Sequence, residues 1–315
     1  MTRAIRARSR RNVHRPTRRD SPGAAVASER QSTEAAAEQK NRKTTSGGLR
    51  VSGLRPSIIA ARARLTEGMA EIRRSHDAGR DGLATARAIS QLREEVLRRL
   101  WAEACAAVFP GCGDGRPAGA ALVAHGGTGR GDISPHSDVD LMLLYDPSRA
   151  AQAAELAQLM VRDVFDAGLT LGHSARTIEE ACRLAGEEPE IATSLMESRL
   201  LAGDAALFDR YWKKFRGSVR RQRRGLLAAV AQSRTEECLR YGETVYLLEP
   251  NVKRSRGGLR DVQWARWIGF ICYGLNELDE LVQAGALSSR DAEIMAAARE
   301  FLLWLRHELH FASDS

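Results

Sequence analysis

The pattern of apolar and polar positions predicts helices first, then a small group of strands, and then helices again. Residues 83–107 carry apolar side chains at helical spacing, among them Ile89, Val96 and Leu100, and this spacing predicts one amphipathic helix. A cluster of glycine and proline residues at 111–119 ends the helical pattern. We therefore expect the folded part of the chain to begin with helices.

Three short apolar runs then predict the strands of one small sheet. An amphipathic helix is expected at 150–167, between the last two strands, and from residue 178 the pattern is helical almost to the end, with a break near 242–258. We therefore expect an α/β (α+β) fold in which a small mixed sheet lies between N-terminal helices and an α-helical C-terminal half. The three predicted strands are Ala120–Ala124, residues 138–145 and residues 169–176.

The positive charge of the chain is concentrated in its first 50 residues. The whole chain has a formal net charge of +8, but residues 1–50 hold 13 Lys and Arg against 4 Asp and Glu. The remaining residues therefore hold 35 basic and 36 acidic side chains. We expect a disordered basic tail over 1–50, and the balance of charge in the rest argues against a nucleic-acid-binding domain.

Composition excludes several other classes of protein. The longest apolar run, residues 267–275, is far shorter than the roughly 20 residues that span a bilayer, so no membrane partner is expected. Aromatic residues make up only 5% of the chain, which leaves few side chains for stacking on nucleic-acid bases. The five cysteines are scattered, without paired short spacing, which favours a reducing, cytoplasmic location.

Two aspartates at the start of a buried strand are the most informative feature of the sequence. Asp138 and Asp140 alternate with Val139, so both carboxylates are expected on one face of the strand, roughly 6.7 Å apart along the backbone. Buried carboxylates are costly without a cation. Two converging carboxylates are typical ligands of paired Mg²⁺ ions in nucleotidyl transfer. We therefore predict that Asp138 and Asp140 are the catalytic, metal-binding residues.

The segment before these aspartates is suited to phosphate binding. The glycines Gly126, Gly127 and Gly129 let backbone N–H groups approach phosphate oxygens, Ser137 offers a hydroxyl, and Arg130 could neutralise a triphosphate. A phosphate-binding P-loop would need a Gly-Lys-Ser/Thr sequence, and a dinucleotide fingerprint would need a helix directly after the glycines. Here a loop containing proline and then a strand are expected instead.

At this point the sequence resembles the nucleotidyltransferase superfamily and, more closely, the N-terminal part of the bacterial protein-PII uridylyltransferases. The resemblance runs from about residue 55 to the end of the chain, and its last two stretches are the most specific to that family. The stretches that carry it are residues 126–141, 171–177, 193–204, 248–253 and 257–263.

The resemblance implies transfer of UMP from UTP to a tyrosine of the PII nitrogen-signalling protein, with Mg²⁺ as cofactor. Lys253 and Arg260 lie on either side of Gly257 and Gly258, so this basic loop could close on phosphates or on PII; alternatively it is a charged surface turn. Many members of the superfamily place a third carboxylate on the third strand. This sequence has His173 and Ser174 there, so Glu197 or Asp261 is a weaker candidate for that role.

Family members continue into an HD-type phosphohydrolase domain and paired ACT domains. The chain ends at Ser315, so neither domain nor uridylyl-removing activity is expected in it. We expect a tail over 1–50, a nucleotidyltransferase core with its N-terminal helices over 51–190 and a helical domain over 191–315. Two other functions stay open: a protein adenylyltransferase of the type that modifies glutamine synthetase, and a truncated product that binds nucleotide or PII without catalysis.

Two further groups of charged residues have simpler interpretations. Residues 213–224 contain seven basic side chains, which form either a docking face for an acidic partner or a solvated helix face. His307 and His310 are three positions apart on the last expected helix, and we interpret them as packing or surface residues rather than metal ligands.

Overall fold

The structure, a computed structural model, describes residues 53–111, 115–241 and 251–313. The expected tail over 1–50 and the family-like residues 248–250 lie outside these ranges. The elements are α2 (Pro56–Asp77), α3 (Gly82–Val108), β1 (Ala120–Ala124), α4 (Gly126–Arg130), β2 (Val139–Tyr145), η1 (Pro147–Arg149), α5 (Ala150–Asp166), β3 (Leu171–Arg176), α6 (Ile178–Glu187), α7 (Pro189–Leu195), β4 (Arg199–Gly203), α8 (Ala205–Arg221), α9 (Arg223–Tyr241), α10 (Leu259–Tyr273), α11 (Leu278–Gln283) and α12 (Ser289–Ser313).

The four strands form one mixed sheet with the order β3-β2-β1-β4. β1 pairs antiparallel with β2 and with β4, whereas β2 and β3 are parallel. The two central strands are almost entirely buried, as continuous apolar runs with helices on both faces should be. The predicted fold class, a mixed sheet within a largely helical chain, is confirmed.

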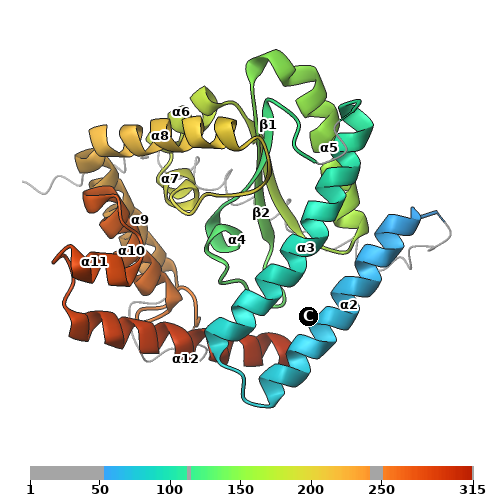
Figure 1. Cartoon of the computed structure of the whole chain (residues 1–315). Coiled ribbons are helices and arrows are strands. Elements are labelled where there is room, and N and C mark those ends of the chain that lie inside the picture. Colours follow the sequence, from blue (N-terminus) through green and yellow to red (C-terminus); the bar gives the residue numbers. More distant parts are fainter. Residues whose placement is uncertain (1–52, 112–114, 242–250, 314–315) are drawn as a thin grey trace, which may run out of the picture. The chain divides into compact units, whose positions relative to one another are not determined.

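Helices cover both faces of this sheet (Figure 1). α2, α3 and α5 lie on the face that receives Leu122 and Leu141, and α6, α7, α8 and α10 lie on the face that receives Val123 and Met142. Because side chains alternate along a strand, Asp140 shares the second face with Met142. The acidic end of β2 therefore faces the C-terminal helices.

The fourth strand corrects the sequence interpretation of residues 193–204. We expected a helix there, but α7 ends at Leu195 and β4 follows. The single edge pairing with β1 selects the strand, although Leu, Ala and Arg have little intrinsic preference for strands. Gly203 ends β4 at a φ of 98°, and Asp204 then caps α8 by accepting a hydrogen bond from the Leu207 amide at 3.0 Å.

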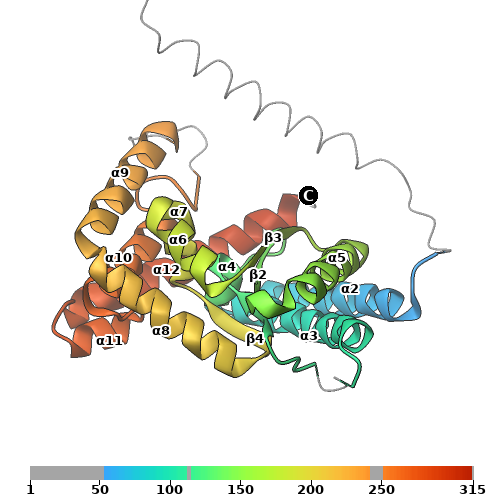
Figure 2. The ribbon, with the colours of Figure 1, turned by 90° about the horizontal axis from the view of Figure 1, so that it is seen from above.

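The last helix, α12, returns to the beginning of the fold and packs on the start of α3 (Figures 1 and 2). The Glu300 carboxylate accepts hydrogen bonds from the amides of Gly82 and Leu83. His307 is fully buried and lies 3.0 Å from the Gly82 carbonyl oxygen. A Cβ at Gly82 would lie 2.4 Å from the Trp304 amide nitrogen, so glycine allows this close contact. No described helix is long and apolar enough to cross a membrane.

Candidate active site

A cavity of about 620 Å³ lies at the start of β2, between the sheet and the C-terminal helices. One side is formed by α4 and the loop that leads into β2. The other is formed by α7, α9, α10, α12 and the turn over 251–258. Cavities of this size are typical of small-molecule sites. Eight of the nine predicted site residues line it: Gly126, Gly127, Arg130, Ser137, Asp138, Asp140, Lys253 and Arg260.

Two glycines make room for the carboxylate of Asp140. A Cβ at Gly126 would lie 2.8 Å from Asp140 Oδ2, and a Cβ at Gly172 would lie 2.9 Å from Asp140 Oδ1. Gly126 also has a φ of 53°, a backbone conformation that residues other than glycine rarely adopt. The Asp140 amide donates a hydrogen bond of 2.9 Å to Thr128 Oγ1, which joins β2 to α4. The carboxylate is thus seated by backbone rather than by other side chains.

No described side chain forms an ion pair with this carboxylate. Burial and the nearby Asp138 carboxylate raise the pKa of Asp140 above its usual value. Among the residues that the structure describes, neither Asp138 nor Asp140 forms an ion pair. Two carboxylates that repel each other at the mouth of a cavity, with only oxygen donors to offer, fit a hard divalent cation such as Mg²⁺.

The loop that carries Asp138 is held from two distant parts of the chain. Arg93 of α3 is almost fully buried and donates hydrogen bonds to the carbonyl oxygens of Pro135 and Ser137. From α12, His310 Nδ1 accepts a hydrogen bond from the His136 amide at 3.1 Å, and the two imidazole rings stack at 5.3 Å. These contacts set the position of the residues directly before Asp138.

Ser137 takes part in this loop rather than standing free in the cavity. Its hydroxyl oxygen accepts a hydrogen bond of 2.9 Å from the Ser134 amide, and the Arg306 guanidinium lies 3.5 Å away. Ser137 therefore helps to shape the turn before β2. The hydroxyl–phosphate contact that we predicted for it stays a prediction.

The glycine-rich segment is a short helix and not the open loop that we expected. α4 covers Gly126–Arg130, and Gly131 ends it in the left-handed conformation with a φ of 67°. Within it, the Gly129 amide donates to the His125 carbonyl oxygen at 2.9 Å, and a Cβ at Gly129 would lie 2.0 Å from the Glu197 carbonyl oxygen. The Gly129 amide thus already has a partner within the protein, and the Cα hydrogen that a side chain would replace faces the Glu197 backbone. The phosphate-binding role of Gly129 stays a prediction.

Arg130 lines the cavity, but its charge is shared with buried acids. Its Nε lies 2.9 Å from Asp132 Oδ1, and its Nη1 lies 3.8 Å from Glu197 Oε1. Against the effect of burial, these two carboxylates raise the pKa of Arg130. Glu197 also accepts a hydrogen bond of 3.0 Å from Trp267 Nε1. The group is a buried network of balanced charges.

Neither candidate for a third catalytic carboxylate is placed to serve as one. Glu197 belongs to the network around Arg130. Asp261 accepts hydrogen bonds from Arg234 and from the Gly257 amide, the latter at 2.7 Å, so it stabilises the turn over 251–258. Within residues 53–111, 115–241 and 251–313, no group of three or more His, Cys, Asp or Glu is placed to hold a metal ion.

The side of the cavity opposite the aspartates is cationic. Burial and the neighbouring guanidinium groups of Arg306 and Arg260 lower the pKa of Lys253 to about 8. The Lys253 ammonium forms no hydrogen bond or ion pair with another described residue. Arg260 lies over the ring of Trp267, 5.1 Å from its centroid, and 3.3 Å from Glu237. Lys253 is thus an uncompensated cation of this wall, and its charge lowers the pKa of Asp140, against the effects of burial and of Asp138.

Three residues in or beside the cavity were not found from the sequence. Arg306 and Arg93 lie in helices where a single arginine gives no signal. His125 Nδ1 lies 2.8 Å from Ser194 Oγ beside the cavity, and burial lowers the pKa of His125 to about 4. His125 directly precedes the glycines, and this position was the only feature of the sequence that could have placed it near the site.

Comparisons with known proteins agree with this geometry. A family model described as "Putative nucleotidyltransferase DUF294" matches residues 69–175, and one described as "GlnD PII-uridylyltransferase" matches residues 226–315. The first covers the sheet strands β1 to β3 with both aspartates, and the second covers the cationic wall.

Similar curated proteins are named bifunctional uridylyltransferase/uridylyl-removing enzyme. The one from Rhodospirillum rubrum is 35% identical over 82% of this chain, that from Aromatoleum aromaticum 36% over 81%, and that from Burkholderia thailandensis 32% over 81%. The matched part is 28% of each of these proteins. The chain therefore spans little more than a quarter of the length of its relatives.

The fold, the paired aspartates beside the glycines and the first family match show a nucleotidyltransferase domain. Within this class, the resemblance to the nucleotidyltransferase part of the bacterial PII uridylyltransferases is confirmed.

Proposed function

We propose that this chain transfers UMP from UTP to a tyrosine hydroxyl of a PII signal protein. The observation that carries the proposal is the single cavity in which two unpaired carboxylates, Asp138 and Asp140, lie opposite the uncompensated Lys253 ammonium. A Mg²⁺ nucleotide needs both features, because its cations seek carboxylate oxygens and its phosphates seek cations.

Asp138 and Asp140 are the residues that would hold Mg²⁺. When bound there, Mg²⁺ would make the acceptor hydroxyl easier to deprotonate and would stabilise the charge of the departing pyrophosphate. The protein itself seats the Asp140 carboxylate between Gly126 and Gly172 and fixes the loop before Asp138 through Arg93. A preformed arrangement of this kind needs little rearrangement when the substrate binds.

Lys253 and Arg260 would bind the phosphates from the opposite wall. An anionic triphosphate close to Lys253 favours its charged form. Binding should therefore raise the pKa of Lys253, which burial lowers in the free enzyme. Arg306, which reaches both the cavity and Ser137, would link phosphate binding to the loop that carries Asp138. PII as acceptor is favoured by the match of residues 226–315 to the PII-uridylyltransferase family model.

The test is incubation of the purified chain with a bacterial PII protein, Mg²⁺ and either UTP or ATP, followed by intact-mass analysis of PII. We expect the mass of one uridylyl group per modified tyrosine with UTP and no change with ATP. Adenylylated PII would show that the substrate is ATP and not the proposed UTP. Unmodified PII together with modified glutamine synthetase in a parallel reaction would show that the acceptor is wrong, and no transfer to either would support a non-catalytic product.

A further inference from the structure

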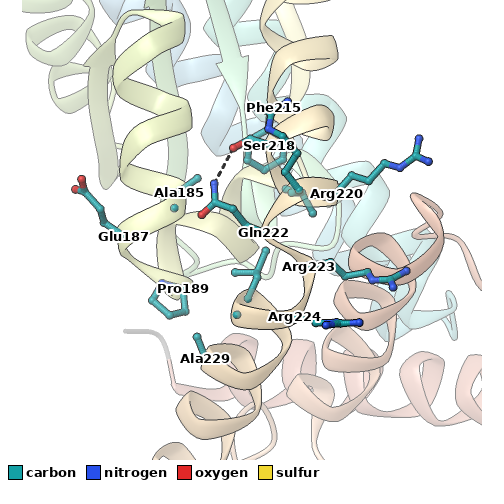
Figure 3. A pocket seen from close by; sticks show the side chains of 15 residues that line it. Ala185, Glu187, Pro189, Phe215, Ser218, Arg220, Gln222, Arg223, Arg224 and Ala229 are labelled. Atoms are coloured by element: carbon teal, nitrogen blue, oxygen red, sulfur yellow. Dashed lines mark hydrogen bonds between the residues drawn. The ribbon is translucent and has the colours of Figure 1, made fainter.

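A second cavity, of about 880 Å³, opens where α6, α8 and α9 meet (Figure 3). Its apolar lining includes Phe215 and Val219, both buried, and Leu226. Its rim carries four arginines that line the cavity on either side of the junction between α8 and α9, and we call them the arginine corner: Arg220, Arg221, Arg223 and Arg224.

The charge of the arginine corner is not compensated within the described part of the chain. All four side chains are exposed, and none of them forms a hydrogen bond or an ion pair with a described residue. Figure 3 shows Arg220, Arg223 and Arg224 extending to the same side. The one acidic residue among the lining residues, Glu187, points to the other side and is paired with Arg183 at 2.7 Å. Four like charges held together in this way favour an anionic partner.

This second cavity adjoins the candidate active site. Pro189 lines both cavities, and the successive residues Ala229 and Val230 of α9 line one cavity each. A polypeptide segment that presents a tyrosine to Asp138 and Asp140 could therefore continue past Pro189 to the arginine corner. Its acidic side chains would meet the arginines, while its apolar ones would cover Leu226 and Ala229, which are partly exposed in the cavity.

We propose that the arginine corner docks an acidic segment of the protein whose tyrosine is modified, and this inference rests on the proposed function. A protein segment fits better than a nucleic acid, because apolar side chains lie next to the arginines in the lining and the basic patch is local. Beyond residue 50 the chain is otherwise balanced, with 35 basic and 36 acidic residues, whereas extended phosphate backbones require long basic tracks. The interaction is electrostatic, so it should weaken with salt.

The experiment compares the full chain with two double variants of equal charge change. Arg223→Glu/Arg224→Glu reverses two residues of the arginine corner. Lys213→Glu/Arg216→Glu reverses two exposed residues of the same basic run that line neither cavity. Affinity for a fluorescently labelled bacterial PII protein is measured by anisotropy without nucleotide at low and moderate salt, and the KM values for PII and UTP are measured separately.

We expect the arginine-corner variant to raise the Kd and the KM for PII by about tenfold, because two attractive contacts become repulsive, while the KM for UTP stays within about twofold. The control variant should change the Kd by less than about twofold. Equal effects of the two variants, unchanged PII binding in the first, or no measurable binding by the unmodified chain would overturn the docking proposal.

The two proposals fail separately. PII binding that depends on Arg223 and Arg224 without uridylyl transfer would refute the proposed function and leave the docking surface in place. Normal uridylyl transfer with an unchanged KM for PII in the arginine-corner variant would refute the docking surface and leave the proposed function in place. Tighter, corner-dependent binding of mixed-sequence DNA than of PII would assign the patch to nucleic acid and so overturn the docking proposal.

Discussion

The two walls of the candidate active site are built in different ways. Asp138 and Asp140 stand at the start of a central strand, where backbone pairing and two glycines determine their positions. The cations opposite them, Lys253, Arg260 and Arg306, come from a turn and two helices outside the sheet. Apolar packing, ion pairs and local hydrogen bonds hold these elements, rather than pairing between strands. Backbone pairing tolerates little displacement, whereas side-chain contacts can open at a lower cost in free energy.

Under the proposed function, this difference separates catalysis from substrate binding. The strand wall would hold the groups that must be placed within a fraction of an ångström for phosphoryl transfer. The helical wall would hold groups that need only approach a flexible triphosphate. Variants of the first wall should therefore lower kcat, and variants of the second should mainly raise KM.

Replacing a strand carboxylate should give the largest effect. Asp140→Asn keeps the size of the side chain but removes a metal ligand, so we expect uridylyl transfer to fall by about 10²- to 10³-fold or more. The fold should be retained, because burial already disfavours the ionised form of Asp140. Transfer is measured with α-labelled UTP, and folding by circular dichroism. If Asp140→Asn and Asp138→Asn retained normal kcat, the carboxylates would have no role in catalysis.

A smaller loss of activity is expected for Arg306, a residue of the helices opposite the aspartates that contacts the loop before Asp138. Arg306→Ala removes the guanidinium beside Ser137, and we expect kcat/KM for UTP to fall by about 10- to 100-fold, as for residues that orient metal ligands. The apparent affinity for Mg²⁺, measured by titration of activity, should weaken as well. The exposed Arg290, which lies on the same helix and does not line the site, provides the control. Equal activities of Arg306→Ala and Arg290→Ala would show that Arg306 has no part in substrate or metal binding and that α12 has a structural role alone.

The mildest prediction concerns the pH dependence of the cationic wall. Because the pKa of Lys253 is lowered to about 8, about a tenth of the free enzyme keeps this charge at pH 9. The kcat/KM for UTP should then fall severalfold between pH 7 and pH 9, but not in Lys253→Arg, whose side chain stays charged. Identical pH profiles of the two proteins would remove Lys253 from phosphate binding.

The same shift predicts a change in stability. A lysine whose pKa is lower in the folded state costs stability while it is charged. The free energy of unfolding should therefore rise from about pH 8 to pH 10.5 as the folded state loses this proton first. Lys253→Met should raise the melting temperature at pH 7, with a gain that shrinks above pH 8. A lower melting temperature of Lys253→Met at pH 7 would contradict the conclusion that the charged Lys253 destabilises the folded state.

The sequence was sufficient for the strand wall because its signals are local. The buried run of β2, the alternation of Asp138 with Val139, and the glycines before them are all visible within about 20 residues. The alternation placed both aspartates in one cavity, as the structure shows. The same reasoning placed α3, α5 and the first three strands close to their observed limits.

The errors arose where tertiary contacts decide the local structure. Four glycines in six residues indicate a loop, yet α4 is helical because Arg199 of β4 binds the carbonyl oxygens of Thr128 and Gly129 at 3.2 Å each. β4 itself was missed because only its pairing with β1 makes it a strand. Arg306, on α12, was missed because its position beside the cavity requires a fold in which residues more than 160 positions apart meet.

The return of α12 to the start of α3 also limits how this domain can be divided. Arg93 grips the aspartate loop from the first half of the sequence, and Arg306 and His310 grip it from the last helix. The glycine–aspartate core is therefore not a self-sufficient module. Transplanted into another scaffold without its final 25-residue helix, it would keep both aspartates and lose the Arg306 and His310 contacts that hold the loop before Asp138.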